Sequence, residues 1–178
     1  MKKAVQTILG FAALALASAV QAQATKTVES KEIGVRLTIP KQWDTSCMTS
    51  GFCVNCAPTK GENGRHACYI SITMYKAQPG QMSITDADRA KWKGWVSAGG
   101  MRTILSAEDM KVGGMPAYHI IEREGKRADD TFGSNVFVLV AGEGKMLRVS
   151  FNAILKPGDY ELYMPGFMKA LQTLVPIP

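Results

Sequence analysis

Alternation of apolar and polar residues marks much of the first half of the chain as β structure. Residues 26–30 form a short Thr/Val segment, and in 35–39 every second residue is apolar, which predicts a half-buried strand. Pro40 ends this strand because proline lacks the amide hydrogen that a sheet ladder needs. Alternation returns over residues 68–75 and predicts another strand, one face of which would be formed by Cys68, Ile70, Ile72 and Met74.

A helical pattern replaces the alternation and runs to about Ala98. Ser83 or Thr85 can cap the helix, and acidic residues in its first turn complement the positive end of the helix dipole. The pair Gly99-Gly100 ends the pattern. Two apolar positions are the tryptophans Trp92 and Trp95, and their spacing favours a core-facing stripe over a ligand platform.

The second half of the chain is richer in strands and closes with a helix. Gly142-Glu143-Gly144-Lys145 has the composition and length of a hairpin loop between two strongly apolar strands. A last helix is expected over residues 160–174, with Asp159 as its candidate cap. This order predicts an α+β fold in which helices cover an antiparallel sheet. The expected strands are 103–110, 117–124, 136–140 and 146–151.

The N-terminal residues have the zones of a secretory signal peptide. Lys2 and Lys3 precede an apolar run over residues 8–19, which is shorter than the roughly 20 residues that a transmembrane helix needs. Small residues then allow cleavage before Thr25 or before Gln23. We therefore expect an exported protein without an N-terminal membrane anchor.

Cleavage would leave one domain, residues 25–178, in the periplasm, with no stable insertion in the membrane. The whole chain carries a formal net charge of +6, and loss of residues 1–24, which hold two lysines and no acid, lowers it to +4. Basic residues are interspersed with acids and do not form a stripe with stacking aromatic residues. Both composition and compartment argue against a nucleic-acid partner.

All four cysteines lie between residues 47 and 68. An even, clustered set in an oxidising compartment predicts two disulfides. Sequence alone leaves the pairing open, and two pairings are favoured: Cys47–Cys68 with Cys53–Cys56, and Cys47–Cys53 with Cys56–Cys68. Residues 51–64 are rich in Gly, Asn and Lys, which predicts a long loop that the disulfides staple.

Several residues could carry chemistry, but each has a structural interpretation that we favour. Cys53-Val54-Asn55-Cys56 has the spacing of a thiol redox motif, and with His66 and Cys68 it could bind zinc. Its loop setting in an exported chain favours disulfides. A catalytic role for His119 would need a nucleophile and an orienting carboxylate, and the sequence indicates neither, so we expect a hydrogen-bonded, half-buried histidine.

Acidic residues cluster near residue 125 and could bind calcium, but no spaced loop of oxygen ligands of the EF-hand type is present. A solvated face is the favoured interpretation, and we expect no metal and no cofactor. These acids are Glu122, Glu124, Asp129 and Asp130.

Two segments resemble the PsbP-like group. Ile33-Gly34-Val35-Arg36-Leu37-Thr38-Ile39-Pro40, followed closely by Trp43, is similar to the opening of that group, and Val112-Gly113-Gly114-Met115-Pro116-Ala117-Tyr118 looks like its turn before the central hairpin. The group includes the extrinsic photosystem II subunit, a Ran-binding import factor, DcrB-type envelope proteins, and chaperones and immunity proteins of type VI secretion. The resemblance implies an α/β/α sandwich that binds other proteins and catalyses no reaction.

The leading hypothesis is therefore a non-enzymatic periplasmic module that binds a secreted toxin or an envelope protein. In its sharpest form, the chain is an immunity protein that inhibits a cell-wall-attacking type VI secretion effector. A pre-organised loop loses less entropy on binding, so the stapled loop supplies the candidate contacts Phe52, Lys60 and Arg65. The alternative is a periplasmic thiol-redox or metal-binding protein that uses residues 47–68.

Overall fold

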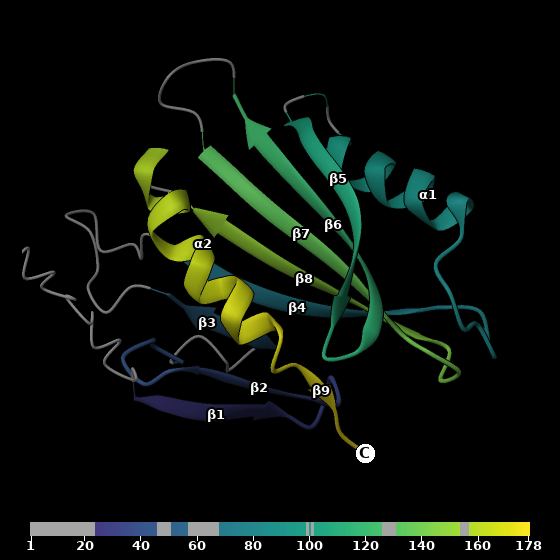
Figure 1. Cartoon of the computed structure of the whole chain (residues 1–178), viewed down its shortest axis with the longest axis horizontal. Coiled ribbons are helices and arrows are strands. Elements are labelled where there is room, and N and C mark those ends of the chain that lie inside the picture. The colour runs from purple at the N-terminus through teal and green to yellow at the C-terminus, as the bar shows by residue number, and fades with distance from the viewer. Residues whose placement is uncertain are drawn as a thin grey trace, which may run out of the picture.

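A computed structural model describes residues 24–45, 51–56, 68–98, 100, 102–125, 131–153 and 157–178. Its main element is a six-stranded antiparallel sheet with the strand order β3-β4-β8-β7-β6-β5 (Figure 1). The strands are β3 (Phe52–Asn55), β4 (Cys68–Lys76), β5 (Arg102–Val112), β6 (Met115–Glu124), β7 (Thr131–Val140) and β8 (Lys145–Ala153).

A second, three-stranded sheet is formed by the two ends of the described chain. Strand β1 (Thr25–Ser30) pairs with β2 (Val35–Pro40), and β2 pairs with the short β9 (Val175–Pro176). The alternation in β2 buries Val35, Leu37 and Ile39, as predicted. The prediction of a single sheet was incomplete, because β9 returns to β2 after the last helix (Figure 1).

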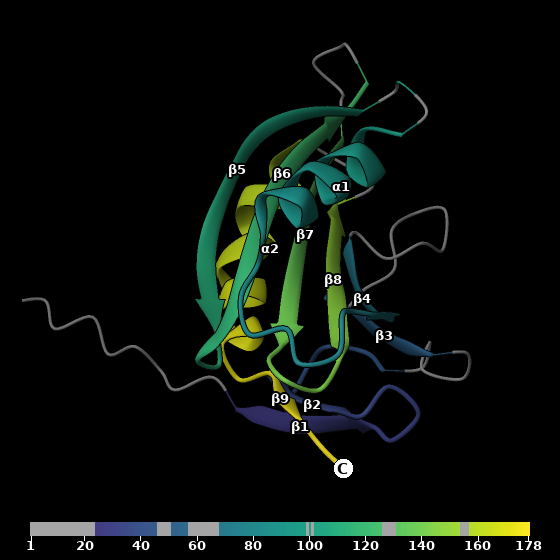
Figure 2. The same cartoon turned by 90° about the vertical axis from the view of Figure 1, so that its right-hand side faces the viewer.

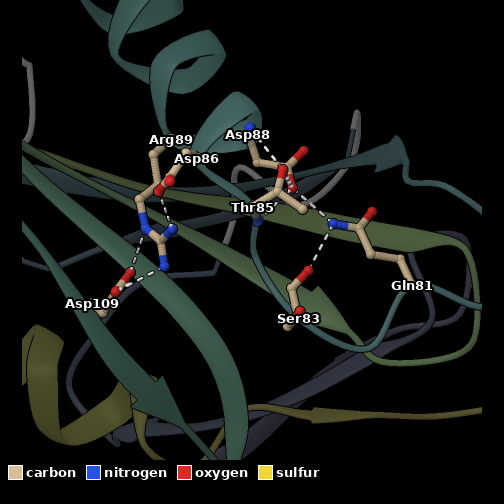
Figure 3. Close-up of polar contacts among 7 residues, drawn as sticks. All are labelled: Gln81, Ser83, Thr85, Asp86, Asp88, Arg89 and Asp109. Atoms are coloured by element: carbon tan, nitrogen blue, oxygen red, sulfur yellow. Dashed lines mark hydrogen bonds and ion pairs between the residues drawn. The ribbon is translucent and has the colours of Figure 1, made fainter.

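Helix α1 (Asp86–Ser97) begins at the predicted cap Thr85. The Thr85 hydroxyl accepts a hydrogen bond from the Asp88 amide, and the Asp88 carboxylate accepts one from the Thr85 amide, which is a complete capping box (Figure 3). Arg89 then joins the helix to β5, because its guanidinium contacts Asp86 at 2.8 Å and Asp109 at 2.9 Å. The cap determines where α1 begins, and the ion pair links α1 to β5, on which it packs together with β6.

Helix α2 (Pro157–Leu171) covers the other face of the six-stranded sheet (Figure 2). The predicted helix of residues 160–174 is displaced: the observed helix starts at Pro157, so Asp159 is not its cap. Proline is well tolerated in the first turn, where no intrahelical partner awaits its amide. Pro165 lies inside the helix, and Gly166 allows close approach to Trp43, whose ring would lie 3.1 Å from an added Cβ.

Each helix covers a separate buried cluster. Beneath α1, the ring of Trp92 stacks on Phe137 with 4.8 Å between centroids and 4° between planes. The larger cluster lies between α2, the six-stranded sheet and β2, and includes Trp43 and Phe151. Trp95 is only partly buried and packs beside Tyr75, so the tryptophans belong to a core-facing stripe, as predicted. The observed architecture confirms the predicted mixed α and β fold with helices on an antiparallel sheet.

The turn from β5 to β6 shows why glycine is needed at Gly113. This residue has φ +54°, and a Cβ there would lie 2.5 Å from the carbonyl oxygen of Leu174. Any side chain would therefore collide with the segment that follows α2. Gly113 thus lets the β5–β6 turn pack closely against the segment that follows α2.

The prediction of a continuous loop over residues 51–64 is wrong at residues 52–55, which form β3. Phe52 pairs with Ile72 and Val54 with Ile70, and both β3 side chains are buried. Residues 57–64 lie outside the described part of the chain, as does the predicted signal peptide up to residue 23. Within the described ranges, no helix is long and apolar enough to cross a membrane.

Candidate functional site

A polar surface occupies half of the sheet face on which α1 lies. The register pairs three residues of β4 with three residues of β8. All six lie on the same face of the sheet as Phe137, the residue on which Trp92 of α1 stacks. Helix α1 packs over β5 and β6, and no described helix packs over this part of the face (Figure 2). All six side chains are at least partly exposed. We call this surface the open half; it consists of Tyr69, Ser71, Thr73, Arg148, Ser150 and Asn152.

A buried hydrogen-bond network borders the open half. The Oε1 atom of Glu122 accepts hydrogen bonds from Arg102 at 3.1 Å and from the side-chain amide of Asn135 at 3.0 Å. The Asn135 carbonyl oxygen in turn accepts from Arg148 Nε at 2.8 Å and from the Ser150 hydroxyl at 2.9 Å. Asn135 therefore connects a buried carboxylate to two residues of the open half and restricts their rotamers.

Beside this network is a cavity of about 130 Å³, which we call the Glu122 cavity. Only 3% of the Glu122 side chain is exposed, and its Oε2 atom has no hydrogen-bond partner in the part of the chain that the structure describes. Such an atom is uncommon, since most buried polar atoms are paired. The described lining consists of Tyr69, Arg102, Glu122, Glu124, Thr131, Phe132, Gly133 and Asn152.

Burial dominates the electrostatics of Glu122 and raises its pKa above the ordinary glutamate value. Arg102 and the hydrogen bond from Asn135 oppose this shift by stabilising the charged form, whereas Glu124 reinforces it. The carboxylate is therefore ionised only at a cost that its present partners do not fully offset.

The raised pKa makes the free energy of unfolding depend on pH. The folded state holds the Glu122 proton more tightly than the unfolded state, so this contribution to stability is complete below the unfolded pKa and is lost as pH rises through the folded pKa. Glu122→Gln cannot ionise. We therefore expect its free energy of unfolding, relative to that of the wild type, to increase as the pH is raised from about 4 to about 7. Urea unfolding at both values measures this difference. The prediction is contradicted if the stability of the variant relative to the wild type falls at the higher pH. Glu29→Gln, at an exposed position on β1, is the matched control.

The predicted hydrogen-bonded histidine is confirmed, although it is more deeply buried than expected. Only 4% of His119 is exposed, and its Nε2 atom lies 2.5 Å from the Ser134 hydroxyl. Burial lowers the pKa of the imidazole, while Glu108, 3.9 Å from Nδ1, acts in the opposite direction. His119 lies on the α2 face with Ala117, opposite to the face of Glu122, so the two residues do not form one site.

The predicted two-disulfide staple is not supported. Among the described cysteines, Cys53 is disulfide-bonded, whereas Cys56 and Cys68 are free and buried. The Cys56 amide donates to the Cys68 carbonyl at 3.0 Å, and their side chains are hydrogen-bonded. Cys56 and Cys68 are therefore neighbours, as the pairing of Cys47–Cys53 with Cys56–Cys68 requires. Their sulfur atoms, however, are not bonded to each other. Cys47 lies outside the described residues.

Burial, reinforced by Cys68, raises the pKa of the Cys56 thiol far above its ordinary value. Because the thiolate is the reactive form, we expect iodoacetamide to modify Cys56 and Cys68 at least about 100-fold more slowly in the folded protein than in urea. Mass spectrometry after timed quenching measures both rates. Rapid labelling of the folded protein would contradict the prediction, and labelling in urea only after reduction would show that the two residues are bridged.

The other predicted site residues do not assemble into one site. Phe52 is 2% exposed and belongs to the core, so it does not present its ring to a partner. Lys60 and Arg65 lie outside the described residues, as do His66, Asp129 and Asp130. No group of three His, Cys, Asp or Glu residues in the described ranges could hold a metal ion.

The interpretation of Glu122 as part of a solvated acidic face is wrong. Period-two alternation places it on the same face as Tyr118 and Ile120, which are buried, and this signal was available in the sequence. Asn135 was missed in the same way: it shares a face with Phe137 inside an apolar strand, where an amide requires partners.

Comparisons with known proteins show the fold. No protein-family model matches the sequence, and neither does any curated protein. The Ran-binding protein Mog1p of Saccharomyces cerevisiae superposes with a TM-score of 0.61 at 10% identity, over 88% of this chain and 97% of Mog1p. LpqN of Mycobacterium tuberculosis, involved in cell envelope biogenesis, gives 0.61 at 13% identity, over 87% and 91% of the two chains. Cyanobacterial PsbP (CyanoP) from Synechocystis sp. PCC 6803 gives 0.53 at 13% identity, over 92% and 98%. The chain therefore has the PsbP-like fold that the sequence resemblance implied.

Proposed function

We propose that the protein is a non-enzymatic, extracytoplasmic module that binds another protein through the open half of its main sheet. The observation that carries this proposal is the ordered polar network under a partly exposed sheet surface. Arg148 lies over the Phe137 ring at 5.8 Å and is held by Asn135, so its guanidinium is positioned before a partner arrives. Groups fixed in advance lose less conformational entropy on binding.

The composition of the open half supports a protein as the partner. Tyr69 and Arg148 are of the residue types enriched in the cores of protein interfaces, and serine and asparagine side chains around them supply hydrogen bonds. The surface combines one aromatic residue and one guanidinium with polar groups, so it can dock a complementary partner while remaining soluble alone. Mog1p, which shares the fold, is described as a Ran-binding protein, and this supports protein binding as a use of the fold.

The immunity hypothesis specifies the partner as a secreted toxin that attacks the cell wall. Its support is the predicted export signal and the sequence resemblance, and the open half replaces the loop of residues 51–64 as the contact surface. Co-expression with the product of the neighbouring reading frame tests it. We expect a stable complex and protection of cells from that product, and the hypothesis fails if no neighbour encodes a secreted toxin and no complex forms.

The thiol-redox alternative is less well supported by the described cysteines. A catalytic thiol needs a lowered pKa and solvent access, whereas Cys56 has a raised pKa and both free thiols are buried. We therefore retain protein binding as the proposed function.

A further inference from the structure

We propose that the Glu122 cavity binds a cationic side chain, the ammonium group of a lysine or the guanidinium group of an arginine, from the partner protein. This inference rests on the proposed function and names the chemistry that the partner must present. The cavity adjoins the open half directly, because Tyr69 and Asn152 belong to both. A partner docked on the open half would therefore bring its side chains to the mouth of the cavity.

The first argument is an unused acceptor on Glu122, one of the residues that line the cavity. Arg102 and Asn135 both donate to Glu122 Oε1, while Oε2 is buried without a hydrogen-bond partner among the described residues. A buried acceptor without a donor carries a desolvation cost of about 1–3 kcal/mol, and more when it is charged. A lysine or arginine side chain supplies several N–H donors together with the complementary charge.

The second argument is that the space beside the carboxylate is maintained by a glycine. Gly133 pairs with Glu122 across β6 and β7, and a Cβ at this position would lie 2.8 Å from Glu122 Oε1. An alanine here would force the carboxylate to move. Glycine in a strand interior commonly marks the close approach of another group, and here it keeps the Glu122 carboxylate in place beside the cavity.

The third argument is the balance of charge. The cavity is lined by two carboxylates, Glu122 and Glu124, and by one guanidinium, that of Arg102, which contacts both. Arg148 also acts on Glu122 from beyond the cavity. The lining itself therefore carries an excess negative charge, which disfavours a phosphate or carboxylate ligand and favours a cation. Tyr69 adds an aromatic side chain, a common neighbour of bound lysine and arginine groups.

Titration of the isotope-labelled exported protein with short blocked peptides tests the proposal by NMR. The probes are N-acetyl-Gly-Arg-Gly-amide, its lysine analogue, and the citrulline analogue, which has nearly the shape of arginine without its charge. We expect the arginine or lysine peptide to shift the amide signals of Thr131 and Gly133 in a saturable manner, with at least about tenfold weaker binding of the citrulline peptide. The relative affinities of the first two peptides distinguish guanidinium from ammonium.

Two variants locate the binding. Glu122→Gln removes the charge but keeps the side-chain length, and Gly133→Ala displaces the carboxylate; each should weaken binding at least about tenfold. Glu29→Gln, on the other sheet, should leave binding unchanged. The proposal is overturned if neither charged peptide binds, if citrulline binds equally well, or if Glu122→Gln binds like the wild type. Should a variant not fold, the comparison of arginine with citrulline on the wild type still decides.

The same titration separates this inference from the proposed function. Calcium chloride alone is a further probe, and saturable shifts with calcium but with neither charged peptide would show a metal site in place of the proposed one. A partner complex that forms equally well with Glu122→Gln would overturn the cavity assignment and leave protein binding intact. Binding of the charged peptides without any partner complex would support the cavity assignment and contradict the proposed protein binding.

Discussion

Replacement of Trp92 by alanine is expected to lower the free energy of unfolding by about 3–5 kcal/mol, the usual cost of deleting a large buried aromatic side chain. Trp92 is 3% exposed, and its ring stacks on Phe137 at 4.8 Å and approaches Tyr118 at 6.2 Å. Trp92 fills the space between α1 and the sheet in this cluster, so its truncation would leave a cavity there.

Urea unfolding followed by far-UV circular dichroism measures this loss. Leu162→Ala is the control, because Leu162 is a large apolar residue on the other helix that is 66% exposed. We expect its effect to stay within about 0.5 kcal/mol. A loss below about 1 kcal/mol for Trp92→Ala would show that α1 is not packed on the sheet as described.

Replacement of Asn135 by alanine is expected to cost about 3 kcal/mol in stability, because it removes three hydrogen bonds at once. Among the described residues, the buried Glu122 carboxylate would retain Arg102 alone as its donor. Arg148 would also lose the acceptor that fixes its guanidinium, so the same variant should weaken partner binding.

The matched control is Asn152→Ala, on the same face and the adjacent strand but only half-buried. Thermal and urea unfolding should place it within about 0.5 kcal/mol of the wild type. Equal losses for the two variants would contradict the role given to the buried network, because burial and connectivity are what distinguish Asn135 from Asn152.

Local sequence signals predicted those elements whose apolar spacing is regular. The β2 alternation, the Thr85 cap and the glycine-rich hairpin between β7 and β8 each depend on neighbouring residues only. Strand β3 was missed because its composition is that of a loop, and it is a strand through pairing with β4. Strand β9 has two residues and exists only because the chain returns to β2 after α2.

The candidate site was harder to predict, because its residues come from five strands, β4 to β8. Glu122 and Asn135 could have been recognised as polar residues on buried strand faces, but which half of a face a helix covers depends on where α1 packs. The network between Arg102, Glu122 and Asn135 depends on the register of β5, β6 and β7, and no local pattern encodes that register. The cysteine cluster was mispredicted for the opposite reason. The compartment argument predicted two bridges, whereas among the described cysteines Cys53 is disulfide-bonded and Cys56 and Cys68 are free.

Site-specific photo-crosslinking in the native host tests most directly whether the open half is the binding surface. A photoreactive benzoylphenylalanine replaces Thr73, an exposed residue of the open half, and in a second strain Thr27, an exposed threonine on β1. We predict a discrete adduct with one protein from position 73, weakened by Arg148→Ala, and none from position 27. An adduct from position 27 alone, or no protein adduct from position 73, would contradict the proposed binding surface.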